Sequence, residues 1–254
     1  MIDSVFDTHF HIIDPRFPVM ENQGFLPPVF TVDNYRARTA GLRIEGGTVV
    51  AGSFQGMQTQ YMQDALEKLG PTFVGVIQVP ATVTDEEILR LNALGVRAVR
   101  FNLYRGGSAG IEDLDRLARR VHDVAGWHAE LYVDASHMEP YLAVLAALPK
   151  ISIDHLGMTQ AGMPSLLRLA ERGAKVKATG FGRTEVDVPG ALRDLAAANP
   201  NCLMFGTDLP SQRAKRPFAP SDMDLILDTL GEELARKVFR DTAVLFYRPH
   251  QTPA

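Results

Sequence analysis

Runs of apolar and β-branched residues recur along the chain between polar or glycine-containing segments, and they predict eight short strands. Between these runs, apolar residues recur three and four positions apart, which is the spacing of an amphipathic helix. The predicted strands are Val5–Ile12, Thr48–Gly52, Phe73–Val79, Ala98–Leu103, Ala129–Asp134, Ile151–His155, Val176–Gly180 and Cys202–Thr207. The predicted helices between them are Tyr61–Leu69, Asp85–Leu94, Ile111–Val124, Glu139–Leu148, Pro164–Arg172 and Pro189–Ala198.

Strand and helix alternate through the chain, and this order predicts parallel strands joined by right-handed helical crossovers. Eight such units within 254 residues fit one α/β domain over residues 1–254, a parallel eight-stranded (β/α)8 TIM barrel. Asp222–Leu230 and Glu232–Tyr247 are predicted as C-terminal helices that close the barrel, and Pro249–Ala254 as a frayed tail. An open doubly wound sheet is the alternative, but its glycine-rich phosphate fingerprint is absent after the first strand.

Composition narrows the class of protein. A chain that is 46% hydrophobic and 22% charged can bury one large core, and a formal net charge of −4 favours neither a nucleic-acid nor a membrane partner. The single cysteine fits a reducing compartment, and the first residues lack the basic segment of a signal peptide. No apolar run reaches the length of a membrane helix. We therefore expect a cytoplasmic protein that acts on a small molecule, with a homo-oligomer left open.

Polar residues gather at the carboxyl ends of the predicted strands, where barrel enzymes carry their chemistry. Both faces of a barrel strand are covered, so its other residues are expected to be nearly all apolar. The residues at these ends are His9 and His11, Arg100 and Asn102, Tyr132 and Asp134, Asp154 and His155, and Thr207 and Asp208. Five strands are thus expected to bring polar groups to one rim.

The pair His9 and His11 is the most informative of these. Residues two apart on a strand point to the same face, so both imidazoles are expected to enter the barrel mouth. One buried histidine is more often a hydrogen-bonded core residue, but two adjacent imidazoles are better explained by a metal ion or an anionic ligand. Asp208 also has an alternative interpretation, as the N-cap of a helix that follows it.

Other segments carry weaker signals. His122 and His128 flank the start of the fifth predicted strand and are expected at the surface of the opposite barrel face, whereas His137 is a weaker candidate for the mouth. The stretch Gln23–Val32 is either a lid over the site or an extended connection. Ser211–Phe218, which contains Arg213, Lys215 and Arg216, is either an electrostatic funnel for an acidic substrate or a solvated loop.

Four segments together resemble the amidohydrolase-related group of the amidohydrolase superfamily: Phe6–His11, Val99–Asn102, Ile153–Gly157 and Phe205–Pro210. The resemblance runs from the first predicted strand to the last and covers nearly the whole chain. It implies a TIM-barrel hydrolase. The group includes lactonases that open 2-pyrone-4,6-dicarboxylate and related carboxylated lactones.

The resemblance also implies roles for individual residues. Asp208 matches the base that activates water, and the residues implied to surround the scissile carbonyl are His9, His11 and His155. Matching positions imply substrate contacts for Arg100, Tyr132 and Arg183, while Arg105 lies one position short of a second substrate-binding arginine. Met158 and Ser211 stand where the pyrone lactonases have an arginine and a histidine, so the resemblance does not fix the exact substrate.

The resemblance leaves two alternatives for the cofactor. Superfamily members with two zinc ions add a histidine on the fifth strand and a lysine or glutamate on the fourth, and neither is present here. One divalent metal such as zinc has adequate ligands in His9, His11 and Asp208, with His155 as a further one. Arg100 nearby disfavours a cation, and the pyrone lactonases work without metal.

These features favour a hydrolase that opens a carboxylated lactone, of the 2-pyrone-4,6-dicarboxylate or muconolactone kind, in aromatic-compound catabolism. Asp208 activates water, the histidines or an ion stabilise the oxyanion, and arginines bind the substrate carboxylates. The expected substrate-binding residues are Arg100, Asn102, Arg105, Tyr132, Arg183 and Arg213. The alternatives are a metal-dependent decarboxylase of an aromatic or unsaturated acid, a sugar lactonase, and a binding protein without turnover.

Overall fold

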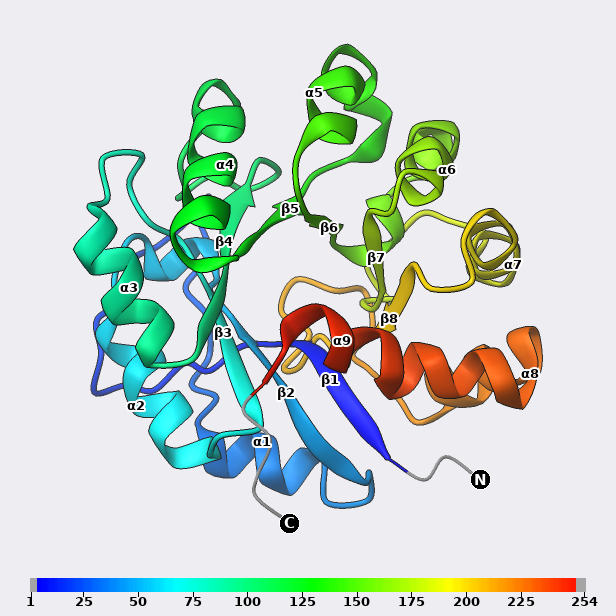
Figure 1. The fold of residues 1–254 in the computed structure, drawn as a ribbon. Helices are drawn as coiled ribbons and strands as arrows, with labels where there is room; N and C mark the ends of the chain where they lie inside the picture. Colours follow the sequence, from blue (N-terminus) through cyan, green and yellow to red (C-terminus); the bar gives the residue numbers. More distant parts are fainter. Residues whose placement is uncertain (1–3, 250–254) are drawn as a thin grey trace.

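The computed structural model describes residues 4–249 and contains one parallel sheet in which eight strands follow each other in chain order (Figure 1). The strands are β1 (Val5–Phe10), β2 (Ile44–Val50), β3 (Phe73–Ile77), β4 (Val96–Asn102), β5 (His128–Tyr132), β6 (Ile151–Ile153), β7 (Lys175–Ala178) and β8 (Leu203–Phe205). Each pair of neighbours from β1–β2 to β7–β8 is parallel, which confirms the (β/α)8 barrel. The predicted tail from His250 onward lies outside the described residues.

The helices surround the strands, and all those predicted between strands are found at the expected places (Figure 1). They are α2 (Gln60–Leu69), α3 (Asp85–Ala93), α4 (Leu114–Ala125), α5 (Leu142–Ala147), α6 (Met163–Glu171) and α7 (Val188–Ala198). An additional helix, α1 (Val32–Arg38), was not predicted because its seven residues are too few to show a helical period. Its start is nevertheless marked in the sequence, since the Thr31 side chain accepts a hydrogen bond from the Asn34 amide.

The helices after β8 close the barrel, as expected, and they do so at its amino-terminal face. The helix α8 (Ser221–Arg236) bends at Gly231, whose φ is 74°, close to the predicted break between two helices. A π-helical turn over Lys237–Asp241 then leads into α9 (Thr242–Tyr247), which crosses in front of β1 and β8 in Figure 1. The buried residues of α9 form a core cluster with six side chains from five strands: Phe6, Val50, Val74, Val76, Ala98 and Met204. This helix therefore plugs the barrel.

Two expectations about burial are wrong. His128 is buried rather than at the surface, with its ring centroid 4.3 Å from that of Phe246 in the plug; His122 is half-buried. The barrel strands are also less apolar than expected, because Glu130 and Lys177 lie fully buried in the middle of β5 and β7. The two charges form an ion pair with an N–O distance of 2.6 Å, so each compensates the desolvation of the other.

The sheet is joined into a barrel by residues that lie just beyond β8. The Asp208 amide donates to the His9 carbonyl at 2.7 Å, and the His11 amide donates to the Leu209 carbonyl at 2.8 Å. The hydroxyl of Thr8 adds a hydrogen bond of 2.8 Å to the Phe205 carbonyl. The contacts that close the barrel therefore also place Asp208 beside the two histidines. Within residues 4–249, no helix is long and apolar enough to cross a membrane.

The plug generates a prediction about stability. Phe246→Ala should lower the free energy of unfolding by about 3–5 kcal/mol, because it removes a buried ring and leaves a cavity. Its neighbour Leu245 is 79% exposed, so Leu245→Ala is a matched control that should change the free energy by less than about 0.5 kcal/mol. Urea denaturation followed by circular dichroism measures both. Equal losses would show that α9 does not plug the barrel.

Candidate active site

The first strand is fixed in place by the carboxylate of Asp7, which is completely buried. This group accepts hydrogen bonds from the amide and the hydroxyl of Thr207, at 2.8 and 2.7 Å, and from the Tyr35 hydroxyl at 3.1 Å. Burial raises the pKa of Asp7 to about 6, although these donors act in the opposite direction. Asp7 lies two residues before His9, the first residue expected to carry chemistry, and it ties β1 to the segment that carries Asp208.

Three imidazoles meet at the carboxyl end of the barrel, as the sequence predicts. The ring centroid of His9 lies 5.2 Å from that of His11 and 4.7 Å from that of His155. His155 has a positive φ of 52°, a costly conformation for a residue other than glycine and one that often marks a functional site. Gly180 makes room for the same ring, since a Cβ there would lie 2.6 Å from its Nδ1 atom.

The two carboxylate oxygens of Asp208 differ in their hydrogen-bond partners. Its Oδ2 accepts hydrogen bonds from Nε and Nη2 of Arg183, at 2.8 and 2.6 Å. Its Oδ1 is buried without a hydrogen-bond partner in residues 4–249 and faces the Nε2 atom of His9, likewise unpartnered, at 3.8 Å. Two buried polar atoms that face each other in this way mark a place for a water molecule or a substrate oxygen. The N-cap alternative for Asp208 finds no support, because the segment after it is not helical.

Burial determines the protonation of the site. It raises the pKa of Asp208 to about 6, with Arg183 acting in the opposite direction. It lowers the pKa of His11 to about 3 and those of His9 and His155 well below their ordinary value, and nearby cations such as Arg100 and Arg183 contribute. Near neutral pH the site therefore offers neutral imidazoles and an ionised Asp208.

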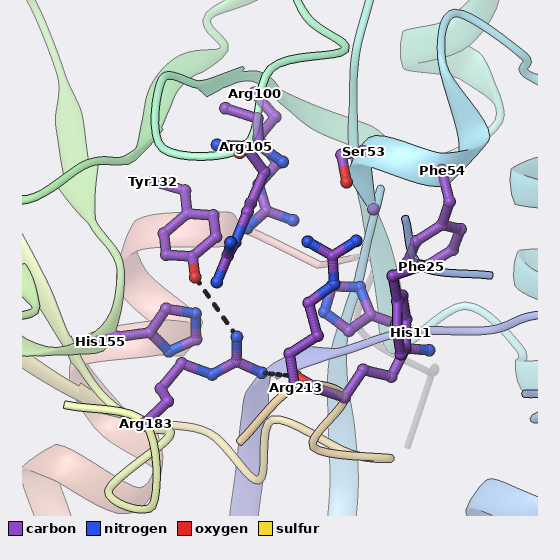
Figure 2. Close-up of a pocket in the computed structure, with 13 residues that line it drawn as sticks. His11, Phe25, Ser53, Phe54, Arg100, Arg105, Tyr132, His155, Arg183 and Arg213 are labelled. Atoms are coloured by element: carbon purple, nitrogen blue, oxygen red, sulfur yellow. Dashed lines mark hydrogen bonds between the residues drawn. The ribbon is translucent and has the colours of Figure 1, made fainter. Parts of the chain in front are cut away.

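A cavity lies above these groups and opens to solvent (Figure 2). Among the residues with predicted roles, those that line it are His11, Arg100, Asn102, Arg105, Tyr132, His155, Arg183 and Arg213. His9 and Asp208 lie below its floor, joined to it through His11, His155 and Arg183. The sequence reasoning missed Ser53, Phe54 and Gln212, which also line it but are ordinary loop residues without a chemical pattern.

The arginines of the cavity fall into two pairs. Arg100 and Arg183 lie deep and are compensated by the carboxylates of Asp154 and Asp208, at 2.7 and 2.6 Å. Arg105 and Arg213 lie at the rim, where each donates to the amino-terminal loop, to the Gln23 side chain and the Asn22 carbonyl respectively. Within residues 4–249 neither rim arginine has a carboxylate partner, which leaves their charges available to an anion.

The remaining candidates divide between the site and its surroundings. Phe25 of the Gln23–Val32 stretch lines the cavity, with the guanidinium carbon of Arg213 at 4.4 Å from its ring centroid, so this stretch covers part of the mouth. Of the three basic residues in Ser211–Phe218, only Arg213 lines the cavity. Lys215 and Arg216 are exposed and form ion pairs with Glu185 and Asp222.

Three further positions that the sequence singled out do not line this cavity. His137 lines a separate, mostly apolar cavity next to Tyr104 and Tyr141 instead of the mouth. Met158 and Ser211, the two departures from the pyrone lactonases, are buried and do not line the cavity over the histidines.

Among residues 4–249, two groups of side chains lie close enough to hold a metal ion: His9, His11 and Asp208, and His9, Asp154 and His155, with ligand atoms within 4.8 Å of one another. The chemistry of these donors fits a cation poorly. Arg183 occupies Oδ2 of Asp208, and both Arg100 and Lys177 contact the Asp154 carboxylate. Three cationic side chains thus already compensate the available negative charge, and a divalent ion would be repelled by them.

A TIM barrel with histidines and an aspartate at the carboxyl ends of β1, β6 and β8 defines a hydrolase-type site. A family model described as amidohydrolase matches residues 6–248. The chain therefore belongs to the amidohydrolase family.

Curated relatives act on lactones. The chain is 29% identical over 244 residues to 4-sulfomuconolactone hydrolase of Rhizobium radiobacter, a match that covers 87% of this chain and 80% of the relative. It is 26% identical over 282 residues to 2-pyrone-4,6-dicarboxylate hydrolase of Comamonas testosteroni, covering 96% and 90%. It is also 26% identical over 251 residues to D-galactarolactone isomerase of Agrobacterium fabrum, covering 91% and 86%.

Solved structures share the fold. A protein of Agrobacterium tumefaciens superposes with a TM-score of 0.86 at 20% identity, over 98% of this chain and 97% of the other. A probable 2-pyrone-4,6-dicarboxylic acid hydrolase of Acinetobacter baumannii, with citric acid bound, superposes with a TM-score of 0.80 at 20% identity, over 96% and 99%.

The link between β1 and β8 generates a second prediction. Thr207→Val removes the hydroxyl that donates to Asp7 and should lower the free energy of unfolding by about 1–3 kcal/mol, because the buried carboxylate loses a donor. Thr82→Val, in an exposed turn, is the control and should change the free energy by less than about 0.5 kcal/mol. Thermal or urea unfolding measures the stability of both variants. If Thr207→Val is as stable as the control, the hydrogen bonds of Asp7 do not hold β1 in place.

Proposed function

We propose that this protein is a hydrolase that opens a lactone carrying carboxylate groups, and that it does so without a resident metal ion. The single observation that carries the proposal is the buried pair of Asp208 Oδ1 and His9 Nε2, 3.8 Å apart beneath a cavity with four arginines. The named activities of the curated relatives, two lactone hydrolases and a lactone isomerase, support the same class of substrate.

The mechanism follows from this pair. Asp208 Oδ1 takes a proton from water while the water oxygen attacks the lactone carbonyl carbon, and the carbonyl electrons move onto its oxygen. Histidine N–H groups stabilise that oxyanion. Collapse of the adduct breaks the ring carbon–oxygen bond, and the proton held by Asp208 passes to the leaving ring oxygen. Lactone and water thus give one ring-opened acid, and Asp208 returns to its ionised form.

The arginines support a carboxylated substrate. Guanidinium groups bind carboxylates with two parallel hydrogen bonds, and four of them line this cavity. Since Asp154 and Asp208 compensate the deep pair, the rim pair Arg105 and Arg213 is the part available to the substrate. Tyr132, whose hydroxyl lies 3.4 Å from Nη1 of Arg183, adds an apolar face for a planar ring.

A cytoplasmic location and a homo-oligomer stay predictions from the sequence.

The experiment that tests the function is turnover of 2-pyrone-4,6-dicarboxylate and 4-sulfomuconolactone, followed by ultraviolet absorbance. Asp208→Asn should remove turnover, whereas Asp224→Asn on the exposed face of α8 should leave it unchanged. Because the pKa of Asp208 is raised to about 6 and its ionised form is the base, the wild-type rate should fall as pH decreases through about 6. An active Asp208→Asn enzyme would remove the base from the mechanism, and release of carbon dioxide would indicate a decarboxylase.

The rim arginines generate a prediction about substrate class. Arg105→Ala and Arg213→Ala should each raise KM for a carboxylated lactone about 10- to 100-fold, because a charge-assisted hydrogen bond contributes about 1.5–3 kcal/mol. KM for a lactone without carboxylates should change less than about threefold. Lys215→Ala, which removes an exposed charge from the same segment, is the matched control. Equal effects on both lactones would exclude carboxylate recognition by these arginines and favour a neutral sugar lactone.

A further inference from the structure

A lysine in the middle of the barrel is in contact with the site but reaches no solvent. Lys177 lies on β7 and is fully buried. Its ammonium group carries three N–H donors, and three acceptors surround it. These are Glu130 Oε2 at 2.6 Å, His9 Nδ1 at 3.3 Å and Asp154 Oδ1 at 3.4 Å. Because the ammonium group is buried, its N–H donors depend on these neighbours, and of the three Asp154 Oδ1 is an ion-pair contact without a hydrogen bond within residues 4–249.

The position of Lys177 limits where the proton of His9 can be. If the neutral imidazole carried its proton on Nδ1, an N–H of Lys177 would face a donor, and the neighbouring Asp154 Oδ1 at 3.3 Å has no hydrogen-bond partner within residues 4–249. With a lone pair on Nδ1, the Lys177 ammonium can donate to both Glu130 Oε2 and His9 Nδ1, and Asp154 keeps its ion pairs with Lys177 and Arg100. We infer that Lys177 is a positioning residue that holds His9 as the tautomer protonated on Nε2.

The neighbouring histidine is held in the opposite tautomer. His11 Nδ1 lies 2.8 Å from the carbonyl oxygen of Val50, which can only accept a hydrogen bond. Its proton is therefore on Nδ1, and its Nε2 presents a lone pair. The two adjacent imidazoles thus differ, because one is held by a donor and the other by an acceptor.

This difference gives the two histidines different tasks. The Nε2–H of His9 points toward Asp208 Oδ1, where it can donate to the attacked carbonyl oxygen as negative charge develops there. A metal ion needs a lone pair on Nε2, so this tautomer also disfavours His9 as a ligand through that atom. The catalytic role of the donor rests on the proposed function, whereas the tautomer does not.

The lysine is itself held from the far side of the barrel. Glu130 Oε2, which accepts from Lys177, also accepts from the Tyr247 hydroxyl at 3.1 Å. Tyr247 belongs to the plug helix α9. A continuous chain of buried contacts therefore runs from the plug through Glu130 and Lys177 to His9. In this chain Tyr247 donates to Glu130, and Lys177 donates to both Glu130 and His9.

The tautomers can be observed without any substrate. In protein labelled with ¹⁵N-histidine, long-range proton–nitrogen correlation spectra distinguish protonated from unprotonated ring nitrogens. His9→Gln and His11→Gln variants assign the two signals. We expect a protonated Nε2 in His9 and a protonated Nδ1 in His11. A protonated Nδ1 in His9 of the wild-type protein would overturn the inference.

Variants test whether Lys177 is the cause. Lys177→Met should move the His9 proton to Nδ1, which lies 3.3 Å from the Asp154 carboxylate, and lower kcat about 10²- to 10³-fold, the usual effect of losing one oxyanion donor. Lys177→Met leaves Glu130 buried without its cation, which could destabilise the fold. The double variant Lys177→Met/Glu130→Gln removes both charges and tests the same effect on the His9 tautomer. Lys175→Met on the same strand, whose ammonium binds the Asn201 carbonyl, is the matched control and should keep the wild-type tautomer.

The outcomes separate this inference from the proposed function. If the folded double variant keeps the Nε2 proton on His9, Lys177 does not set the tautomer and the inference fails. If the tautomer changes as expected but the wild-type protein opens no carboxylated lactone, the inference stands and the proposed function fails.

Discussion

The site depends on the hydrogen bonds that join the end of β8 to β1. Asp7 accepts from the amide and hydroxyl of Thr207, and the next residue, Asp208, donates its own amide to the His9 carbonyl. These bonds close the barrel, and they also bring a carboxylate from one end of the chain to within 3.8 Å of an imidazole from the other. The same hydrogen bonds therefore close the barrel and assemble the site. Buried polar groups are stable there because many of them are partners in these bonds.

The second organising feature is charge compensation inside the barrel. Glu130, Asp154 and Asp208 each lie against a cation, at 2.6, 2.7 and 2.6 Å. Isolated charges at these depths would be strongly disfavoured, whereas paired ones keep fixed positions and fixed proton locations. The same pairing leaves the rim arginines as the uncompensated charge of the cavity and leaves little for a divalent cation to neutralise. Substrate preference and cofactor use thus follow from one distribution of charge.

Much of the architecture could be predicted from the pattern of residues. The eight strands and most helices follow from apolar runs and helical spacing, and His9, His11, His155 and Asp208 are recognisable because ionisable residues at strand ends are rare in a buried barrel. The short helix α1 could not be found by period. The burial of His128 and Lys177 could not be found either, because a strand pattern shows alternation but not which residues of distant strands meet.

The sequence by itself determined the fold class and which side chains reach the carboxyl end of the barrel, because strand period and strand order decide both. Only the tertiary structure decided how those side chains act. It assigned Arg183 to Asp208, Arg100 to Asp154 and Lys177 to His9, and it left Lys215 in solvent. The physical reason is that pairing, burial and proton position depend on distances between residues far apart in the chain, and local sequence carries no measure of those distances.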